Sequence, residues 1–201
     1  EKIVKEAVDD ITFSVAEGEA LAFIGPNGAG KSTTIKMLTG ILYPTSGDIK
    51  VLGYNPSKER VKLSREIGTV FGQKEQLWVH LSAYENFKFF AAIYDIKKEE
   101  LEKKIEELAS LFEIKEFMHQ PVKSLSLGQR MKCEMVASLL HNPKMLFFDE
   151  PTIGLDPIAK ETLRNLIKKM NRELGITILF TSHDLGDIEE VCKRVIIIYN
   201  A

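Results

Sequence analysis

The sequence predicts an α/β fold from three observations: apolar runs typical of strands, helical patterns between them, and a central stretch with almost no strand pattern. Helical patterns occupy 31–39 and 157–174, and the helical stretch runs from about 81 to 140. The strand-like runs lie at 11–15, 20–24, 48–52, 67–71, 145–149, 176–180 and 195–199. We therefore expect a sheet with helices packed on it and one helical insertion.

The composition of the strands predicts how they pair. The runs "MLFF", "ITILF" and "VIIIY" are continuously apolar, which is typical of strands buried on both faces of a parallel sheet. The runs at 11–15 and 48–52 alternate apolar with polar residues, as half-exposed antiparallel strands do. A mostly parallel sheet with an antiparallel β edge is the expected core.

Glycines mark the ends of two helices, and capping signals mark helix starts. The helix at 31–39 ends at Gly40 and the helix at 157–174 ends at Gly175, where a left-handed cap suits glycine. In the central stretch, "SAYE" at 82–85 is a capping box. In 98–113, apolar residues repeat at helical spacing among Glu and Lys, so this helix should bury one stripe.

We expect one domain over 1–201. Segments 1–73 and about 141–201 should form the α/β core, and about 74–140 the helical subdomain.

Composition and charge exclude several classes of protein. The net charge is −2, so no basic field indicates nucleic-acid binding, and we expect no nucleic-acid partner. The apolar runs are far shorter than the about 20 residues needed to cross a bilayer. The two cysteines, Cys133 and Cys192, have no metal-ligand spacing and are expected to be packing residues. These features predict a cytoplasmic chain.

The segment "GPNGAGKST" fits the phosphate-loop pattern G-x-x-x-x-G-K-[ST] between a strand and a helix. Backbone N–H groups and the helix start would cradle phosphate, Lys31 would reach the terminal phosphates, and Ser32 would place its hydroxyl on Mg²⁺. A tight glycine turn that feeds a helix is the alternative, but strand, loop, Lys-Ser pair and helix are all in register with the pattern. The candidate nucleotide contacts are Gly25, Pro26, Asn27, Gly28, Ala29, Gly30, Lys31, Ser32 and Thr33.

Polar residues follow three other strands, where the ligand crevice of an open parallel sheet lies. Asp149 is a candidate Mg²⁺ ligand, and Glu150 a candidate general base that polarises water. The alternative for this pair is an ordinary turn before Pro151. His183 and Gln73 are less specific, because a lone histidine or a glutamine after a strand is usually a surface residue. Gln73 could coordinate Mg²⁺ or orient water.

The stretch "SLGQ" at 126–129 is a second helix start. Ser126 and Gln129 form a capping box, which on its own explains them. Gly128 is less expected, because glycine in a first turn is less stable than alanine by roughly 0.5–1 kcal/mol. A bare backbone there suits an anionic oxygen that approaches closely, and the chain already has one phosphate loop. We therefore expect this second helix start to close on nucleotide held by another copy.

These motifs resemble those of the nucleotide-binding subunits of ATP-binding cassette (ABC) transporters, most like those that serve export-type permeases for drugs, lipids or glycans. "GPNGAGKST" resembles Walker A, "VFGQ" the Q-loop, "LSLGQ" the signature, "MLFFDEP" Walker B, "GLDP" at 154–157 the D-loop, and "TSH" the switch histidine. The six elements follow in the family's order from Gly25 to His183.

The resemblance implies an ATPase with a P-loop NTPase core whose cofactors are ATP and Mg²⁺. Two subunits, identical or different, would form a head-to-tail dimer on the inner face of the cell membrane, bound to a permease. The implied catalytic residues are Lys31, Glu150 and His183, and the implied metal ligands are Ser32, Gln73 and Asp149. Ser126, Gly128 and Gln129 would contact the ATP held by the partner subunit, and Asp156 would lie along the interface. Trp78, Leu81 and Tyr84 are candidate permease contacts, with core packing as the alternative.

Two departures from the family pattern matter. Leu127 stands where the signature usually has glycine, although Ser126 and Gly128 remain. Nothing aromatic precedes Phe13, which shares a face with Ile11 and Val15, so we expect Phe13 in the core and assign no adenine-stacking residue. The main alternative is a soluble ABC-type ATPase of translation or DNA repair, although these usually carry two cassettes or a long insertion. A P-loop kinase or GTPase would leave "LSLGQ" and "TSH" unexplained.

Overall fold

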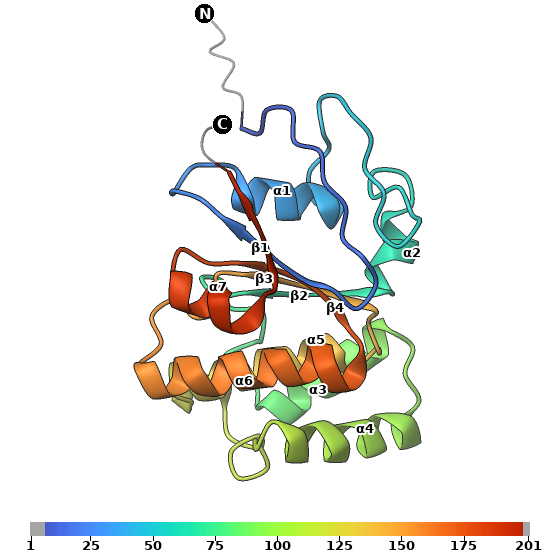
Figure 1. Cartoon of the computed structure of the whole chain (residues 1–201). Helices are drawn as coiled ribbons and strands as arrows, with labels where there is room; N and C mark the ends of the chain where they lie inside the picture. The colour runs from blue at the N-terminus through green and yellow to red at the C-terminus, as the bar shows by residue number, and fades with distance from the viewer. Residues whose placement is uncertain (1–6, 199–201) are drawn as a thin grey trace, which may run out of the picture.

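A computed structural model describes residues 7–198 and arranges them as a parallel sheet between layers of helices (Figure 1). The strands are β1 (Ala20–Ile24), β2 (Ile67–Phe71), β3 (Met145–Asp149), β4 (Thr177–Thr181) and β5 (Arg194–Ile197). The helices are α1 (Lys31–Leu38), α2 (Arg60–Ser64), α3 (Ala83–Ile93), α4 (Lys98–Leu111), a 3₁₀ turn η1 (Val122–Ser124), α5 (Leu127–Leu139), α6 (Pro157–Leu174) and α7 (Leu185–Val191).

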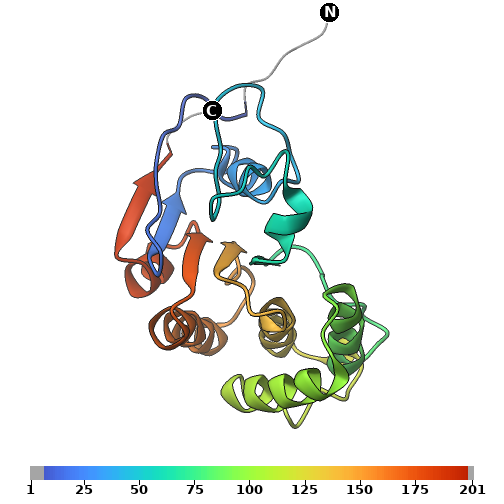
Figure 2. The ribbon, with the colours of Figure 1, turned by 90° about the vertical axis from the view of Figure 1, so that its right-hand side faces the viewer.

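The sheet has the order β2-β3-β4-β1-β5, and each strand is parallel to its neighbours in this order. Helix α1 covers one face, and α5, α6 and α7 cover the other (Figure 2). Alternate side chains of β1 divide between the two cores: Leu21 and Phe23 join the cluster under α1, and Ala20 and Ala22 join the larger cluster on the other face. The predicted α/β fold with a parallel sheet is confirmed.

The helical insertion runs from α3 to α5, between β2 and β3. Ser82 and Glu85 form the predicted capping box of α3, with the Ser82 hydroxyl accepting from the Glu85 N–H. The predicted stripe of α4 is buried at Leu101, Ile105 and Leu108, with Phe112 just beyond the helix. The limits proposed for the subdomain, 74 and 140, stay a prediction.

The two glycine helix ends are also as predicted. Gly175 caps α6 with a φ of 66°, and Gly40 follows α1 with a φ of 73°. Both cysteines are buried, and burial raises the pKa of each thiol to about 12. Thiols of this kind stay protonated at neutral pH, as packing residues do.

The predicted antiparallel edge is wrong for the described residues. Segments 11–15 and 48–52 form no strand, and near them only an isolated antiparallel bridge joins Val51 to Tyr54. Their apolar residues still pack on the core, as Phe13 does edge-on against Phe23 with ring centroids 4.9 Å apart. The alternating pattern correctly indicates that one face of each segment is buried. An extended segment can bury one face without pairing with a neighbouring strand.

The last apolar run was also misjudged. β5 forms as predicted, but Val195 is 39% and Ile197 50% exposed, because β5 has only β1 beside it among the described strands. Tyr199 lies outside the described residues. Within residues 7–198, no helix has both the length and the apolar character that a bilayer span requires.

Replacing Ser82 by alanine should lower the free energy of unfolding by about 1 kcal/mol, because α3 loses its N-cap hydrogen bond. Urea denaturation would measure the loss. Ser110→Ala is the control, since the Ser110 hydroxyl only donates to the Glu106 carbonyl inside α4. A loss no larger in Ser82→Ala than in Ser110→Ala would contradict the assigned cap.

Candidate nucleotide-binding site

The carboxyl ends of four neighbouring strands meet in one row of the sheet. Phe71 of β2 is paired with Asp149 of β3, Asp149 with Thr181 of β4, and Thr181 with Phe23 of β1. We call these four residues the end row. Asp149 belongs to the end row, and the other candidate residues at strand ends follow a residue of the end row by one or two positions: Gly25, Gln73, Glu150 and His183. Parallel pairing in register therefore places these residues at one edge of the sheet.

Asp149 joins the sheet to the phosphate-loop helix through hydroxyl groups. Its Oδ1 accepts from the Ser32 hydroxyl at 3.0 Å and from the Thr181 hydroxyl at 2.7 Å. The Thr181 hydroxyl also accepts from the Glu150 N–H at 3.0 Å. No sequence motif singles out Thr181, although a threonine at the end of a buried strand has its hydroxyl at the ligand edge.

Glu150 lies in a tight backbone turn. Its φ is 53°, and a Cβ placed on Gly72 would lie 1.9 Å from the Glu150 carbonyl oxygen. The loop after β2 therefore approaches Glu150 as closely as glycine alone allows. The side chain of Glu150 has two basic side chains beside it: its Oε2 lies 2.6 Å from Nδ1 of His183, and its Oε1 lies 3.9 Å from Nζ of Lys31.

The phosphate-loop sequence forms a turn that leads into α1. Gly30 is the N-cap of α1 with a φ of 87°, and a Cβ on it would lie 2.5 Å from the Ala7 carbonyl oxygen. Lys31 is 6% exposed, and its ammonium donates to the carbonyl oxygens of Gly25 at 2.6 Å and Pro26 at 3.1 Å. A buried ammonium and the start of an eight-residue helix thus face the same space.

A cavity of about 470 Å³ lies where these groups converge. Its lining contains ten of the predicted residues: Asn27, Gly28, Ala29, Gly30, Lys31, Ser32, Thr33, Gln73, Asp149 and Glu150. Sequence reasoning missed Lys36 and Lys74, which also line it and add positive charge. His183 is not among the lining residues and meets the site through Glu150.

Four predicted residues lie apart from this cavity and have local partners. Ser126 caps α5 in the predicted box with Gln129, and Asp156 caps α6 by accepting from the N–H groups of Ile158 and Ala159. A Cβ on Gly128 would lie 3.2 Å from the Cβ of Ala159. Packing against α6 therefore supplies a reason for glycine within the chain, which the sequence argument had attributed to an anion.

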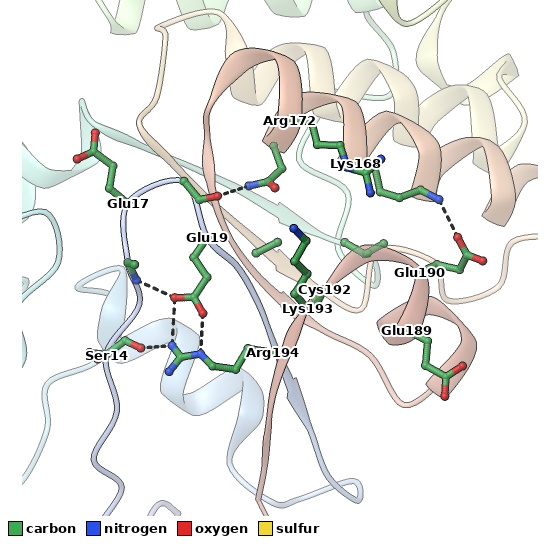
Figure 3. A pocket seen from close by; sticks show the side chains of 15 residues that line it. Ser14, Glu17, Glu19, Lys168, Arg172, Glu189, Glu190, Cys192, Lys193 and Arg194 are labelled. Carbon is green, nitrogen blue, oxygen red and sulfur yellow. Dashed lines mark hydrogen bonds and ion pairs between the residues drawn. The ribbon is translucent and has the colours of Figure 1, made fainter.

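A second cavity, of about 620 Å³, lies at the opposite edge of the sheet, where β1 and β5 begin (Figure 3). Several of its charged side chains neutralise one another: Arg194 pairs with Glu19, and Lys168 with Glu190. Arg194 also donates to the Ser14 carbonyl oxygen. Ligand crevices of open α/β sheets lie at the other edge, so we take the 470 Å³ cavity as the candidate site.

Known proteins share both the sequence and this architecture. The ABC transporter family model matches residues 8–153. The chain is 38% identical over 192 residues to the uncharacterized ABC transporter ATP-binding protein YhcH of Bacillus subtilis, an alignment that covers 95% of this chain and 61% of YhcH. The chain thus spans about three fifths of the length of that relative.

Two solved structures have the same fold. The dimeric cassette MJ0796, in a post-hydrolysis state with ADP and Pi, matches with a TM-score of 0.86 and 28% identity, over 98% of this chain and 90% of that one. CbiO1 of Clostridium perfringens, part of the ABC transporter complex cbiONQ, matches with a TM-score of 0.86 and 33% identity, over 95% and 77%. Motifs, site geometry and family match agree: the chain belongs to the ABC transporter family.

Proposed function

We propose that this chain binds and hydrolyses ATP and powers a membrane transporter as one subunit of a head-to-tail dimer. The observation that carries the proposal is the end row, which brings the phosphate loop, Gln73, Asp149 and Glu150 around one cavity. Membership of the ABC transporter family and the likeness to a cassette dimer with ADP and Pi support it.

Lys31 and the start of α1 bind the phosphates in this proposal. The Lys31 ammonium is held at the loop by two carbonyl oxygens, so its charge is already placed at the cavity before substrate arrives. A terminal phosphate oxygen would replace those carbonyls with a stronger, charge-assisted bond. The N–H groups of residues 27–33 supply further donors at the positive end of the helix.

The donor set around Asp149 fits Mg²⁺. The Ser32 hydroxyl and the Asp149 carboxylate are 3.0 Å apart, and the exposed amide of Gln73 lines the same cavity. All three offer oxygen atoms, and Mg²⁺ usually takes one or two carboxylates and shares its remaining positions with phosphate and water. Mg²⁺ held there would neutralise charge on the phosphates. Thr181 keeps Asp149 oriented through its hydroxyl.

Glu150 acts as the general base, and His183 and Lys31 keep it in place. His183 Nδ1 contacts the Oε2 oxygen, and Lys31 Nζ lies 3.9 Å from Oε1, beyond hydrogen-bond distance, so Oε1 would accept the proton of an attacking water. The turn at Glu150, held by Thr181 and the close approach of Gly72, fixes the carboxylate at the mouth of the cavity.

The start of α5 serves the partner subunit. Ser126 is exposed and lies outside its own chain's cavity, so it is available to nucleotide on another copy together with Gly128 and Gln129. Asp156, capping α6, lies along the interface.

The permease would dock on the helical insertion, with the subunit on the inner face of the membrane. Trp78 is 49% exposed and its ring centroid lies 3.9 Å from that of Phe89, which is also exposed. These two rings and the exposed side chain of Ile93 form an apolar surface. Trp78 follows Gln73 in the chain by five residues, so this surface is close in sequence to the cavity. Leu81 and Tyr84 are partly buried, and Tyr84 packs on the core, so Trp78 is the strongest of the three earlier candidates.

Lys31→Ala should weaken ATP binding about 10- to 100-fold, because it removes a charge-assisted contact to phosphate. Calorimetry with Mg²⁺ present would measure the affinity. Lys62→Ala is a matched control, since Lys62 pairs with Glu59 on the surface, outside the residues that line the cavity. Equal affinity in Lys31→Ala and wild type would remove Lys31 from the phosphate site.

Glu150→Gln should keep ATP affinity but lower kcat by about 100-fold or more, because the amide cannot accept the proton of water. Steady-state ATPase assays and nucleotide binding would be compared on the same preparation. Turnover close to wild type would show that another group is the base.

Mixed subunits should show that Ser126 and Gly128 act on the partner's ATP. Lys31→Ala and Gly128→Asp subunits should each be inactive alone. Random pairing of the two should restore activity to about a quarter of wild type, since one composite site in each heterodimer is intact. Gly128→Ala is the control, because it makes the same 3.2 Å contact with Ala159 without a charge. If Gly128→Asp abolishes ATP binding by the isolated monomer, the helix start serves its own chain and the sandwich is wrong.

A further inference from the structure

Glu134, in the middle of α5, is a buried carboxylate that the candidate site does not use. It is 1% exposed, and burial raises its pKa to about 7, against the opposing effect of the Arg130 guanidinium. Within the described residues neither of its oxygens has a hydrogen-bond partner, and the nearest cation, Nε of Arg130, is 3.6 Å away. A buried carboxylate paired this loosely destabilises the fold, so stability alone does not explain it.

The Arg130 guanidinium has a second carboxylate partner, on the loop that carries Gln73. Its Nη1 donates to Oε1 of Glu75 at 2.7 Å. The Gln76 backbone N–H lies near the Glu134 carboxylate and lowers its pKa, although it forms no full hydrogen bond with either oxygen. The segment 74–78, which we call the linking segment, therefore lies against α5 through Arg130 and Glu134. It joins Gln73, at the cavity, to Trp78, on the exposed apolar surface.

The far end of the linking segment is fixed to α3. The buried Asn86 accepts from the Trp78 N–H at 2.8 Å and donates to the Trp78 carbonyl oxygen at 3.1 Å, and Leu77 is buried in the core. These contacts involve no ionisable side chain. The end near Gln73 depends instead on the charged trio of Glu75, Arg130 and Glu134.

We propose that Arg130 and Glu134 are positioning residues that hold the linking segment against α5, so that the placement of Gln73 depends on the helix that begins at Ser126. The proposal rests on the proposed role of Gln73 at the nucleotide. In this proposal α5 has two roles. The start of α5 faces the partner's ATP, and Arg130 and Glu134, in its second and third turns, position the loop of the same chain that carries Gln73.

The charge on Glu134 should control how the linking segment is held against α5. The charged groups that act on it are Arg130 on α5 and Glu75 on the linking segment. With Glu134 ionised, the guanidinium is shared between two carboxylates. With Glu134 protonated, the guanidinium pairs with Glu75 alone, and the linking segment shifts relative to α5. Because the pKa of Glu134 is about 7, both forms are populated near neutral pH.

Trp78 is a built-in probe of this shift, because it is the chain's single tryptophan and its exposed ring lies three residues after Glu75, while only its backbone is held by Asn86. Its fluorescence should titrate with a midpoint near pH 7 in wild type, and the titration should vanish in Glu134→Gln. Two controls should retain it. Glu113→Gln breaks an exposed ion pair with Lys132, also on α5. His80→Gln removes the histidine nearest to Trp78 in the sequence.

Activity and stability separate positioning from folding. Glu134→Gln should lower kcat for ATP about three- to tenfold with KM changed less than about twofold, and Glu134→Asp should recover part of the loss. Its Tm above pH 7 should equal or exceed that of wild type. The raised pKa makes the folded state bind the proton more tightly than the unfolded one, so the contribution of this group to stability falls as pH rises from the ordinary value of 4.5 to about 7 and is constant above that.

Two results would overturn the proposal: a fluorescence titration in Glu134→Gln identical to wild type, or a kcat and pH–rate profile identical to wild type. A chain that shows the Trp78 titration but hydrolyses no ATP would contradict the proposed function instead. The two failures are therefore distinguishable.

Discussion

The candidate site depends on one constraint, the common register in which four parallel strands end. Phe71, Asp149, Thr181 and Phe23 are paired side by side, so the loops that follow start from one line. A slip of one residue in a single pairing would turn its side chains to the other face of the sheet and separate the groups around Asp149. Thr181 stabilises this alignment, since its hydroxyl donates a hydrogen bond to Asp149 and accepts one from the backbone N–H of Glu150.

Features that depend on nearby residues could be predicted from the sequence. The start of α5 at Ser126, the end of α6 at Gly175 and the buried stripe of α4 all follow from residues within one or two turns. The phosphate loop belongs to the same class, because its glycines and Lys31 act within one turn. The order of the strands in the sheet cannot be predicted from nearby residues. For that reason the alternating pattern at 48–52 wrongly predicted a strand, and the exposure of β5 was not predicted.

Gly128 shows how one residue can have two physical explanations. From the sequence, a bare backbone in the first turn of α5 indicated an anion. In the structure, Ala159 of α6 occupies the space beside it. The partner-subunit role therefore stands on the exposed position of this helix start and on the family, and not on the glycine alone. Only the packing of α5 on α6, which the sequence does not encode locally, separates the two explanations.

Three contacts connect the cavity to the exposed apolar surface. Ser32 and Asp149 join the phosphate-loop helix to the sheet, and the close approach of Gly72 to Glu150 joins the sheet to the loop that carries Gln73. Arg130 and Glu75 then join that loop to α5. The first and last of these contacts involve charged groups, so a change of charge at the proposed nucleotide site would act on them. The linking segment that Arg130 holds then ends at Trp78, on the surface proposed for the permease. The proposed nucleotide site and the proposed docking surface are thus joined by contiguous contacts and one short segment, and Glu134 is the titratable group beside that segment.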